Sequence, residues 1–219
     1  MFGMDIQTII FLWIIIVISL SLHEYAHAWM ADRLGDPTPK MQGRLTPNPL
    51  AHIDPIGFIM IFLIWFGWWK PVITDPRYFR DPVKWDFLVA MAWPITNLIL
   101  ALFGGIFMML YGRVIWLESA YAVLQWSDLV LQFWMMFTTI NVALAVFNLL
   151  PLYPLDGYRL IKVVSPSAWH RMERNGRIIQ FIVLIAILWP WSRIIGNIVS
   201  TVAHKILSFL FIFLSQIFY

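Results

Sequence analysis

The sequence predicts an all-α protein that crosses a lipid bilayer several times, and its composition is the first reason. Of the 219 residues, 61% are hydrophobic and only 12% are charged, and the mean hydropathy is +0.76. A soluble domain carries about twice that share of charged residues. The polar stretches are all short, so we expect one membrane domain over residues 1–219 and no separate soluble domain.

Long apolar runs give the second reason for this fold class. Three of them, at about residues 6–31, 87–111 and 129–150, predict the core helices, because each suffices for a bilayer core of about 30 Å. Two further apolar segments, at about 178–191 and 194–219, predict additional C-terminal transmembrane helices.

The region 36–69 follows a different pattern. Its first part is rich in proline and glycine, and short pieces within 40–46 predict a small β-hairpin. The apolar stretch 56–69 is short for a membrane span and ends in a run rich in tryptophan, which favours the interface. We therefore expect a re-entrant segment that enters the membrane and returns.

The most informative motif is His-Glu-Tyr-Ala-His, which begins at His23 inside the first apolar run. His23 and His27 lie four positions apart on one helical face, a spacing that suits one Zn²⁺, and Glu24 beside them is placed to act as a general base. Three such side chains in lipid without a partner would cost several kcal/mol. A metal removes that cost and supplies the chemistry of hydrolysis by activated water.

Two histidines leave a catalytic zinc one protein ligand short. The remaining candidates are His52, Asp54 and Asp156. We favour Asp156, because it follows an apolar span, where an unpaired carboxylate is costly. Its alternative role is to cap the N-terminus of a following helix. Cysteine is absent, so histidine and carboxylate are the available ligands, and no disulfide forms.

Charge placement predicts the topology. If Asp156 meets the His-Glu face, the 6–31 and 129–150 helices end on the same side of the membrane and the 87–111 helix begins there. Most lysines and arginines also fall in stretches on that side. By the positive-inside rule this side is the cytoplasm, and the N-terminus is outside. The basic residues form no cluster interleaved with stacking aromatics, so we expect no nucleic-acid partner.

The motifs together resemble the site-2 protease family of intramembrane zinc metalloproteases, in its short form without a PDZ or other regulatory domain. The matching pieces are His23-Glu24-Tyr25-Ala26-His27, Asn148-Leu149-Leu150-Pro151 leading to Leu155-Asp156-Gly157, and the segment from Gly67 through Arg80. The resemblance implies one Zn²⁺ per chain bound by His23, His27 and Asp156, with Glu24 as catalytic base. It also implies a catalytic core of three helices.

One position departs from the family pattern. The family usually has Gly-Pro-x-x-Asn in the middle core helix, and this chain has Trp93-Pro94-Ile95-Thr96-Asn97. The large side chain replaces a glycine that would permit close helix contact or substrate approach.

Four polar residues are weaker candidates for holding the substrate carbonyl or the oxyanion: Asn148, Asn97, His52 and Asn141. The alternative for the asparagines is helix packing through hydrogen bonds, and for His52 a fixed hydrogen bond in its loop.

These observations predict a zinc endopeptidase of a cell (cytoplasmic) membrane that cuts membrane proteins within or next to a transmembrane segment. Its active site is expected nearer the cytoplasmic face, and a homo-oligomer is possible. The alternative is a membrane metal transporter or metal-binding protein, because intramembrane histidine and aspartate also line ion paths. A third reading is an inactive relative, against which the intact His23, Glu24, His27 and Asp156 argue.

Overall fold

The computed structural model of the chain describes residues 5–64, 69–117, 123–153, 155–176, 178–179, 182–183 and 192–218. Helices make up all the regular structure in this part of the chain. They are α1 (Ile6–Arg33), α2 (Thr38–Met41), α3 (Pro49–His52), α4 (Pro55–Ile64), the 3-10 helix η1 (Pro76–Tyr78), α5 (Pro82–Leu117), α6 (Val123–Asn148), α7 (Tyr158–Val164), α8 (Pro166–Arg174) and α10 (Ser192–Phe218).

Four of these helices contain segments long and apolar enough to cross a membrane: Ile6–Arg33, Pro82–Gly112, Leu129–Asn148 and Arg193–Phe218. They confirm the predicted core helices and the predicted helix at 194–219. The predicted segment at 178–191 lies mostly outside the described residues. The exposed side of α1 carries an apolar stripe that suits a membrane span, because isoleucines recur there every fourth residue, at Ile6, Ile10, Ile14 and Ile18.

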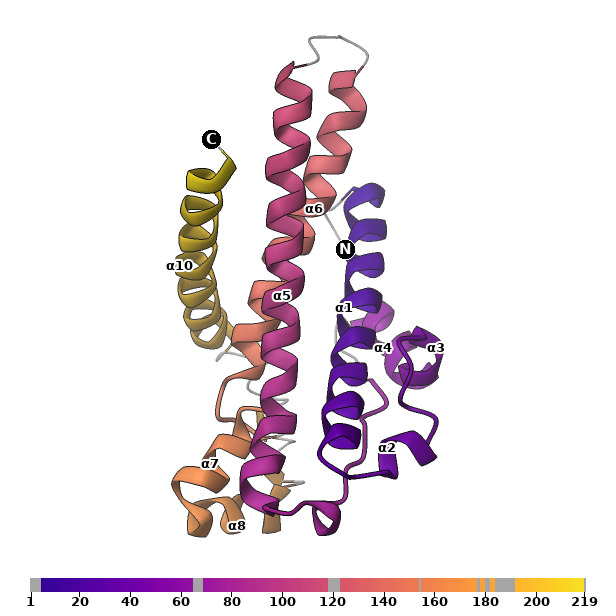
Figure 1. The fold of residues 1–219 in the computed structure, drawn as a ribbon, viewed down its shortest axis with the longest axis vertical. Coiled ribbons are helices and arrows are strands. Elements are labelled where there is room, and N and C mark those ends of the chain that lie inside the picture. The colour runs from indigo at the N-terminus through magenta and orange to yellow at the C-terminus, as the bar shows by residue number, and fades with distance from the viewer. Residues whose placement is uncertain are drawn as a thin grey trace.

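The long helices stand side by side, with α5 between α1 and α10 and with α6 packed along α5 (Figure 1). The ends of α1 and α6 and the start of α5 lie at one end of the bundle, where α7 and α8 also lie (Figure 1). The relative directions of these helices are those that the sequence predicts, and the side of the membrane stays a prediction.

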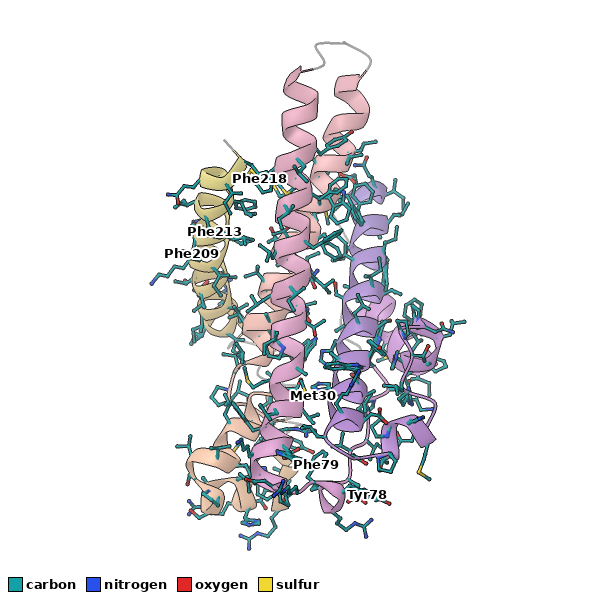
Figure 2. All side chains as sticks on the ribbon, in the orientation of Figure 1. Met30, Tyr78, Phe79, Phe209, Phe213 and Phe218 are labelled. Carbon is teal, nitrogen blue, oxygen red and sulfur yellow. The ribbon has the colours of Figure 1, made fainter. Side chains whose placement is uncertain are left out.

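Aromatic side chains occur both on the exposed surface of the bundle and in its buried interior. Phe209 and Phe213 point away from the other helices on the outer face of α10 and are 71% and 47% exposed (Figure 2). Phe79 instead is buried with Ala31 and Val89 against Met30, and so closes the end of the α1–α5 contact (Figure 2).

The predicted β-hairpin is wrong, because the segment 40–46 folds as the end of α2 followed by a turn, and the described residues contain no strand. Pro39 lies in the first turn of α2, where proline is well suited to a helix. Gly43 has a φ of 69°, which glycine adopts without strain, and it lets the chain reverse. The Arg44 amide then donates to the Pro39 carbonyl at 2.8 Å and closes the turn.

The re-entrant segment stays a prediction. Its helix, α4, has 10 described residues, which span about 15 Å at 1.5 Å per residue. That length is about half of a bilayer core. In Figure 1, α4 stands beside α1 with α2 and α3, toward the end of the bundle that carries α7.

Candidate metal centre

The site is built where α1 meets the turn between α6 and α7. His23 and Glu24 are neighbours on α1, His27 lies one turn further along, and all three are less than 10% exposed. Ser19, one turn earlier, is fully buried on the same face. Asp156 comes from the turn that follows α6, and its side chain is 16% exposed. Residues separated by 129 positions in the sequence thus meet in the bundle.

The distances suit a single cation. His27 Nε2 lies 3.2 Å from Asp156 Oδ2, and His23 Nε2 lies 3.9 Å from the same oxygen. One ligand atom of each of these residues lies within 4.8 Å of the others. Tetrahedral bonds of about 2.0–2.1 Å place ligand atoms about 3.3 Å apart, so two imidazoles and a carboxylate at these separations fit zinc.

The hydrogen bonds of His27 support the same conclusion. Its Nδ1 lies 2.8 Å from the Val89 carbonyl oxygen of α5, while its Nε2 faces the Asp156 carboxylate. Both neighbours are acceptors, but a neutral imidazole has only one N–H. A hydrogen on Nδ1 satisfies Val89 and leaves the Nε2 lone pair for a cation shared with Asp156. This is the usual way in which a second contact fixes the tautomer of a metal-binding histidine.

Glu24 is placed beside the cluster and is held from its other side. Its Oε1 lies 3.4 Å from His23 Nε2, and its Oε2 accepts a hydrogen bond of 2.9 Å from the Val72 amide. The segment before η1 therefore anchors one carboxylate oxygen and leaves the other facing the ligand atoms. The sequence gives no direct signal for this contact, because it uses the backbone of Val72.

The backbone around Asp156 is tightly constrained. The Gly157 amide donates to the Asn148 carbonyl at 2.7 Å and so ties the turn to the end of α6. A Cβ at Gly157 would lie under 3.0 Å from the carbonyl oxygens of Leu149 and Leu150, closer than real contacts allow. The alternative role of Asp156 as a helix cap does not apply, because Gly157 is the N-cap of α7 and no side chain caps it.

The other two candidates for the third ligand are used elsewhere. Asp54 Oδ1 accepts a hydrogen bond of 2.8 Å from the Gly57 amide at the start of α4. His52 is fully buried, and its Nε2 lies 2.8 Å from the Thr46 carbonyl oxygen. Neither belongs to the metal-ligand cluster found among the described residues.

The surroundings of His52 commit its one ring hydrogen to its own loop. Burial lowers the pKa of His52, and nearby Arg44 lowers it further. The neutral ring keeps its hydrogen on Nε2, which donates to Thr46, and its buried Nδ1 has no partner. In this arrangement Nδ1 carries no hydrogen, and the role of His52 at an oxyanion stays a prediction.

Two of the three asparagines, Asn97 and Asn141, join α5 to α6, and Asn148 lies at the end of α6. Asn97 Nδ2 donates to Asn141 Oδ1 at 3.1 Å, and Asn141 Nδ2 donates to the Phe137 carbonyl at 2.8 Å. Both are fully buried, as helix-linking amides in membranes often are. Asn148 donates to the Leu144 carbonyl at 3.1 Å and is 9% exposed. Because an amide has two hydrogens, Asn148 keeps one that is not used within α6.

Trp93, at the position where the family usually has glycine, packs directly on the first histidine. Its ring centroid lies 3.5 Å from that of His23, and the side chain is 1% exposed. His23 Nδ1 is buried without a hydrogen-bond partner, unlike Nδ1 of His27. The indole ring therefore restrains His23 by contact, where His27 is restrained by a carbonyl.

One apolar groove in the described part of the chain has a volume of about 470 Å³ and lies between α6 and α10. Its lining includes Phe147 and His204 but none of the residues of the metal-ligand cluster. The apolar groove is therefore not part of the metal-ligand cluster.

The fold and the cluster define a protein with a two-histidine, one-carboxylate metal centre set among membrane-spanning helices. Comparison with known proteins agrees with this class. The model of peptidase family M50 matches residues 112–190, which include Asp156. YwhC of Bacillus subtilis (strain 168), which carries the name of a zinc metalloprotease, is 39% identical over 189 residues, covering 82% of this chain and 84% of its own length.

More distant relatives carry a similar name. Rip2 of Mycolicibacterium smegmatis is 32% identical over 148 residues, and Rip2 of Mycobacterium tuberculosis (strain H37Rv) is 30% identical over 151 residues. These matches cover 65% and 67% of this chain, and 52% and 54% of the Rip2 proteins. No solved structure matches the chain.

The chain belongs to peptidase family M50, the site-2 protease family of zinc metalloproteases. The resemblance that the sequence motifs indicate is thereby confirmed, and with its four apolar helices the chain is an integral membrane protein.

Proposed function

We propose that this protein is an intramembrane zinc endopeptidase that hydrolyses a peptide bond within or next to a transmembrane segment of a membrane-protein substrate. One observation carries the proposal: the motif that begins at His23 faces inward from a membrane-spanning helix and meets Asp156 there. His23 lies 17 residues after the start of α1, or about 25 Å along it, so the site is below the helix end rather than outside the bundle.

In this proposal His23, His27 and Asp156 are the zinc ligands. Bound zinc supplies a Lewis acid that polarises the scissile carbonyl and lowers the pKa of a water ligand. Val89 fixes the His27 tautomer, and Trp93 restrains the His23 ring.

Glu24 is the general base and then the general acid. Its Oε1 faces the ligand atoms and accepts the proton of the attacking water, and the same carboxyl group returns that proton to the leaving amine. The water oxygen forms a bond to the carbonyl carbon, and the peptide C–N bond breaks. The Val72 amide holds Oε2 throughout, which keeps the base in one rotamer.

Asn148 is the best placed of the four candidate donors for the substrate. It is the one asparagine of the three that is not fully buried, and it lies at the end of α6, where the Asp156 turn begins. Asn97 donates to Asn141, and Asn141 donates to the Phe137 carbonyl, which suits a structural role in joining α5 and α6.

The active site is proposed to open toward the cytoplasmic side of a cell membrane. The end of the bundle that carries α7 and α8 is rich in exposed basic residues, including Arg33, Lys84, Arg171 and Arg174. Positive charge favours the cytoplasmic face. Transmembrane protein segments are the proposed partners, and homo-oligomerisation is a further possibility within the proposal.

The test is to reconstitute the purified chain in lipid vesicles with a model substrate that has one transmembrane helix. Zinc content and the cut site, mapped by mass spectrometry, are measured together. The proposal expects about one zinc per chain and a cut within or next to the apolar segment. Cuts confined to soluble loops would refute the intramembrane part and leave the metalloprotease class intact.

A further inference from the structure

We infer that Asp86 is a positioning residue, which holds the turn that carries Asp156 against the two histidines by binding two cations of α7. This inference rests on the proposed function, because it takes Asp156 to be a zinc ligand. Asp86 lies in the second turn of α5 and has no part in the site that the sequence predicts.

Both oxygens of Asp86 are engaged by α7. Arg159 Nη1 donates to Oδ1, and Lys162 Nζ donates to Oδ2 at 2.8 Å. Asp86 is 6% exposed, and the side chains of Arg159 and Lys162 are 25% and 13% exposed. One largely buried carboxylate thus binds two cations, and removing it costs more than breaking a surface pair, because it leaves largely buried charges without a partner.

These cations belong to the same short segment as the proposed ligand. The Arg159 amide donates to the Asp156 carbonyl oxygen at 2.9 Å, so the first turn of α7 continues directly from the ligand. Lys162 Nζ also lies 4.7 Å from the centre of the Trp169 ring of α8. Asp86 therefore holds more than one side chain in place. It holds α7, which packs on α8 and continues directly from Asp156.

The same turn of α5 also supports the histidine side of the site. Val89, three residues after Asp86 and so on the same helical face, offers its carbonyl to His27 Nδ1. Asp86 and Val89 thus connect one stretch of α5 to both proposed ligands, His27 and Asp156. If that stretch loses its hold on α7, the two ligands no longer share one rigid support.

A charge argument points in the same direction. Arg159 interacts electrostatically with Asp156 as well as with Asp86. Without Asp86, Arg159 would lack its partner and would compete with the metal for the Asp156 carboxylate. The loss of Asp86 should therefore weaken metal binding even if the helices stay packed.

The test compares zinc affinity and apo-protein stability in the 219-residue chain in detergent micelles. Asp86→Asn removes the charge and keeps the size, and Asp86→Glu keeps the charge. Asp81→Asn is the matched control, because Asp81 lies at the same helix end, where its carboxylate caps the Val83 and Lys84 amides and, among the described residues, makes no hydrogen bond or ion pair with α7. Zinc Kd is measured by competition with a chelator, and unfolding is measured in EDTA.

We expect Asp86→Asn to raise the zinc Kd about 10- to 100-fold, the usual effect of losing a residue that supports a metal ligand. Asp86→Glu should recover part of this loss, and Asp81→Asn should change the Kd less than about threefold. The d–d absorption of the Co²⁺-substituted protein should also change in Asp86→Asn. A lower apo stability with an unchanged zinc Kd and an unchanged Co²⁺ spectrum would overturn the inference.

Two further variants keep the outcome decisive. If Asp86→Asn does not fold, Lys162→Met removes one of the two α7 cations and should still raise the zinc Kd, and an unchanged Kd there would count against the inference. Asp156→Ala is titrated beside them. If Asp156→Ala binds zinc like the wild type, the proposed ligand set fails; if it does not bind and the Asp86 variants bind normally, the positioning role alone fails.

Discussion

The sharpest prediction concerns Glu24→Gln, because the structure separates its proposed catalytic role from metal binding. Glu24 Oε2 accepts from the Val72 amide, and Oε1 lies 3.4 Å from His23 Nε2. In glutamine, the amide oxygen can keep the bond to Val72, so the –NH₂ group faces the ligand atoms. An amide nitrogen does not accept a proton from water, whereas the three proposed zinc ligands are unchanged.

The expected loss is therefore that of general base catalysis alone, about 10²- to 10⁴-fold in kcat. The assay follows cleavage of a substrate with one transmembrane helix in vesicles, with zinc content measured in the same sample. Glu173→Gln, an exposed position on α8, is the matched control and should cleave at the wild-type rate. Normal cleavage by Glu24→Gln would refute the mechanism, and loss of zinc from this variant would show that Glu24 is needed to hold the metal.

Four further predictions test the surroundings of the site. Asp156→Ala should lose both bound zinc and cleavage, as measured by metal analysis and the vesicle assay, and retained zinc would exclude it as a ligand. Trp93→Gly should lower the free energy of unfolding by about 3–5 kcal/mol, the range for removing a large aromatic side chain from a core, and should weaken zinc binding. Trp93→Phe should keep stability and zinc binding near wild type, because phenylalanine still packs on His23. Gly157→Ala should cost about 1–3 kcal/mol through overpacking against backbone carbonyls and should lower zinc occupancy, as thermal unfolding with and without zinc would show. The pKa of His52 is lowered in the folded state, so the contribution of His52 to stability is complete above about pH 6.5 and is lost as the pH falls through the lowered pKa. His52→Asn should flatten this part of the profile of unfolding free energy against pH, measured in EDTA. An unchanged slope would contradict the assignment.

The sequence predicts the membrane helices well, because the bilayer imposes a length and an apolar composition that can be read locally. The helix predicted at 87–111 is real but starts earlier, at Pro82, because Asp81 accepts hydrogen bonds from the amides of Val83 and Lys84 and so caps the first turn. The hairpin at 40–46 was predicted wrongly. Proline and glycine there indicate a break in helical structure, but whether the chain turns by extended or helical geometry depends on the contacts of Pro39 and Arg44.

Some features of the candidate site could likewise be predicted from the local sequence, and others could not. The spacing of His23 and His27 can be read from one helix, and a lone carboxylate after an apolar span pointed to Asp156. The supports of these residues could not be predicted from local pattern, because Val72 and Val89 act through their backbones and the sequence specifies no partner for them. Asp86 did offer a signal, a carboxylate at the start of an apolar helix, but its partners on α7 lie 73 and 76 residues away.

A cluster of two histidines and one aspartate among membrane helices could belong either to a peptidase or to a metal transporter. Transport needs successive weak sites along a route, and among the described residues the metal-ligand groups amount to one cluster, made of His23, His27 and Asp156. Transport also needs ligands that can exchange, whereas His27 is tied to α5 and the Asp156 turn is tied to α6 and α7. Glu24, held by Val72 beside the cluster rather than within it, has no purpose in an ion path but is where a base must be for water to attack a carbonyl. A rigid site with an adjacent base is an arrangement for catalysis, and zinc flux through vesicles that equals protein-free leakage, together with cleavage of a membrane substrate, would settle the choice in its favour.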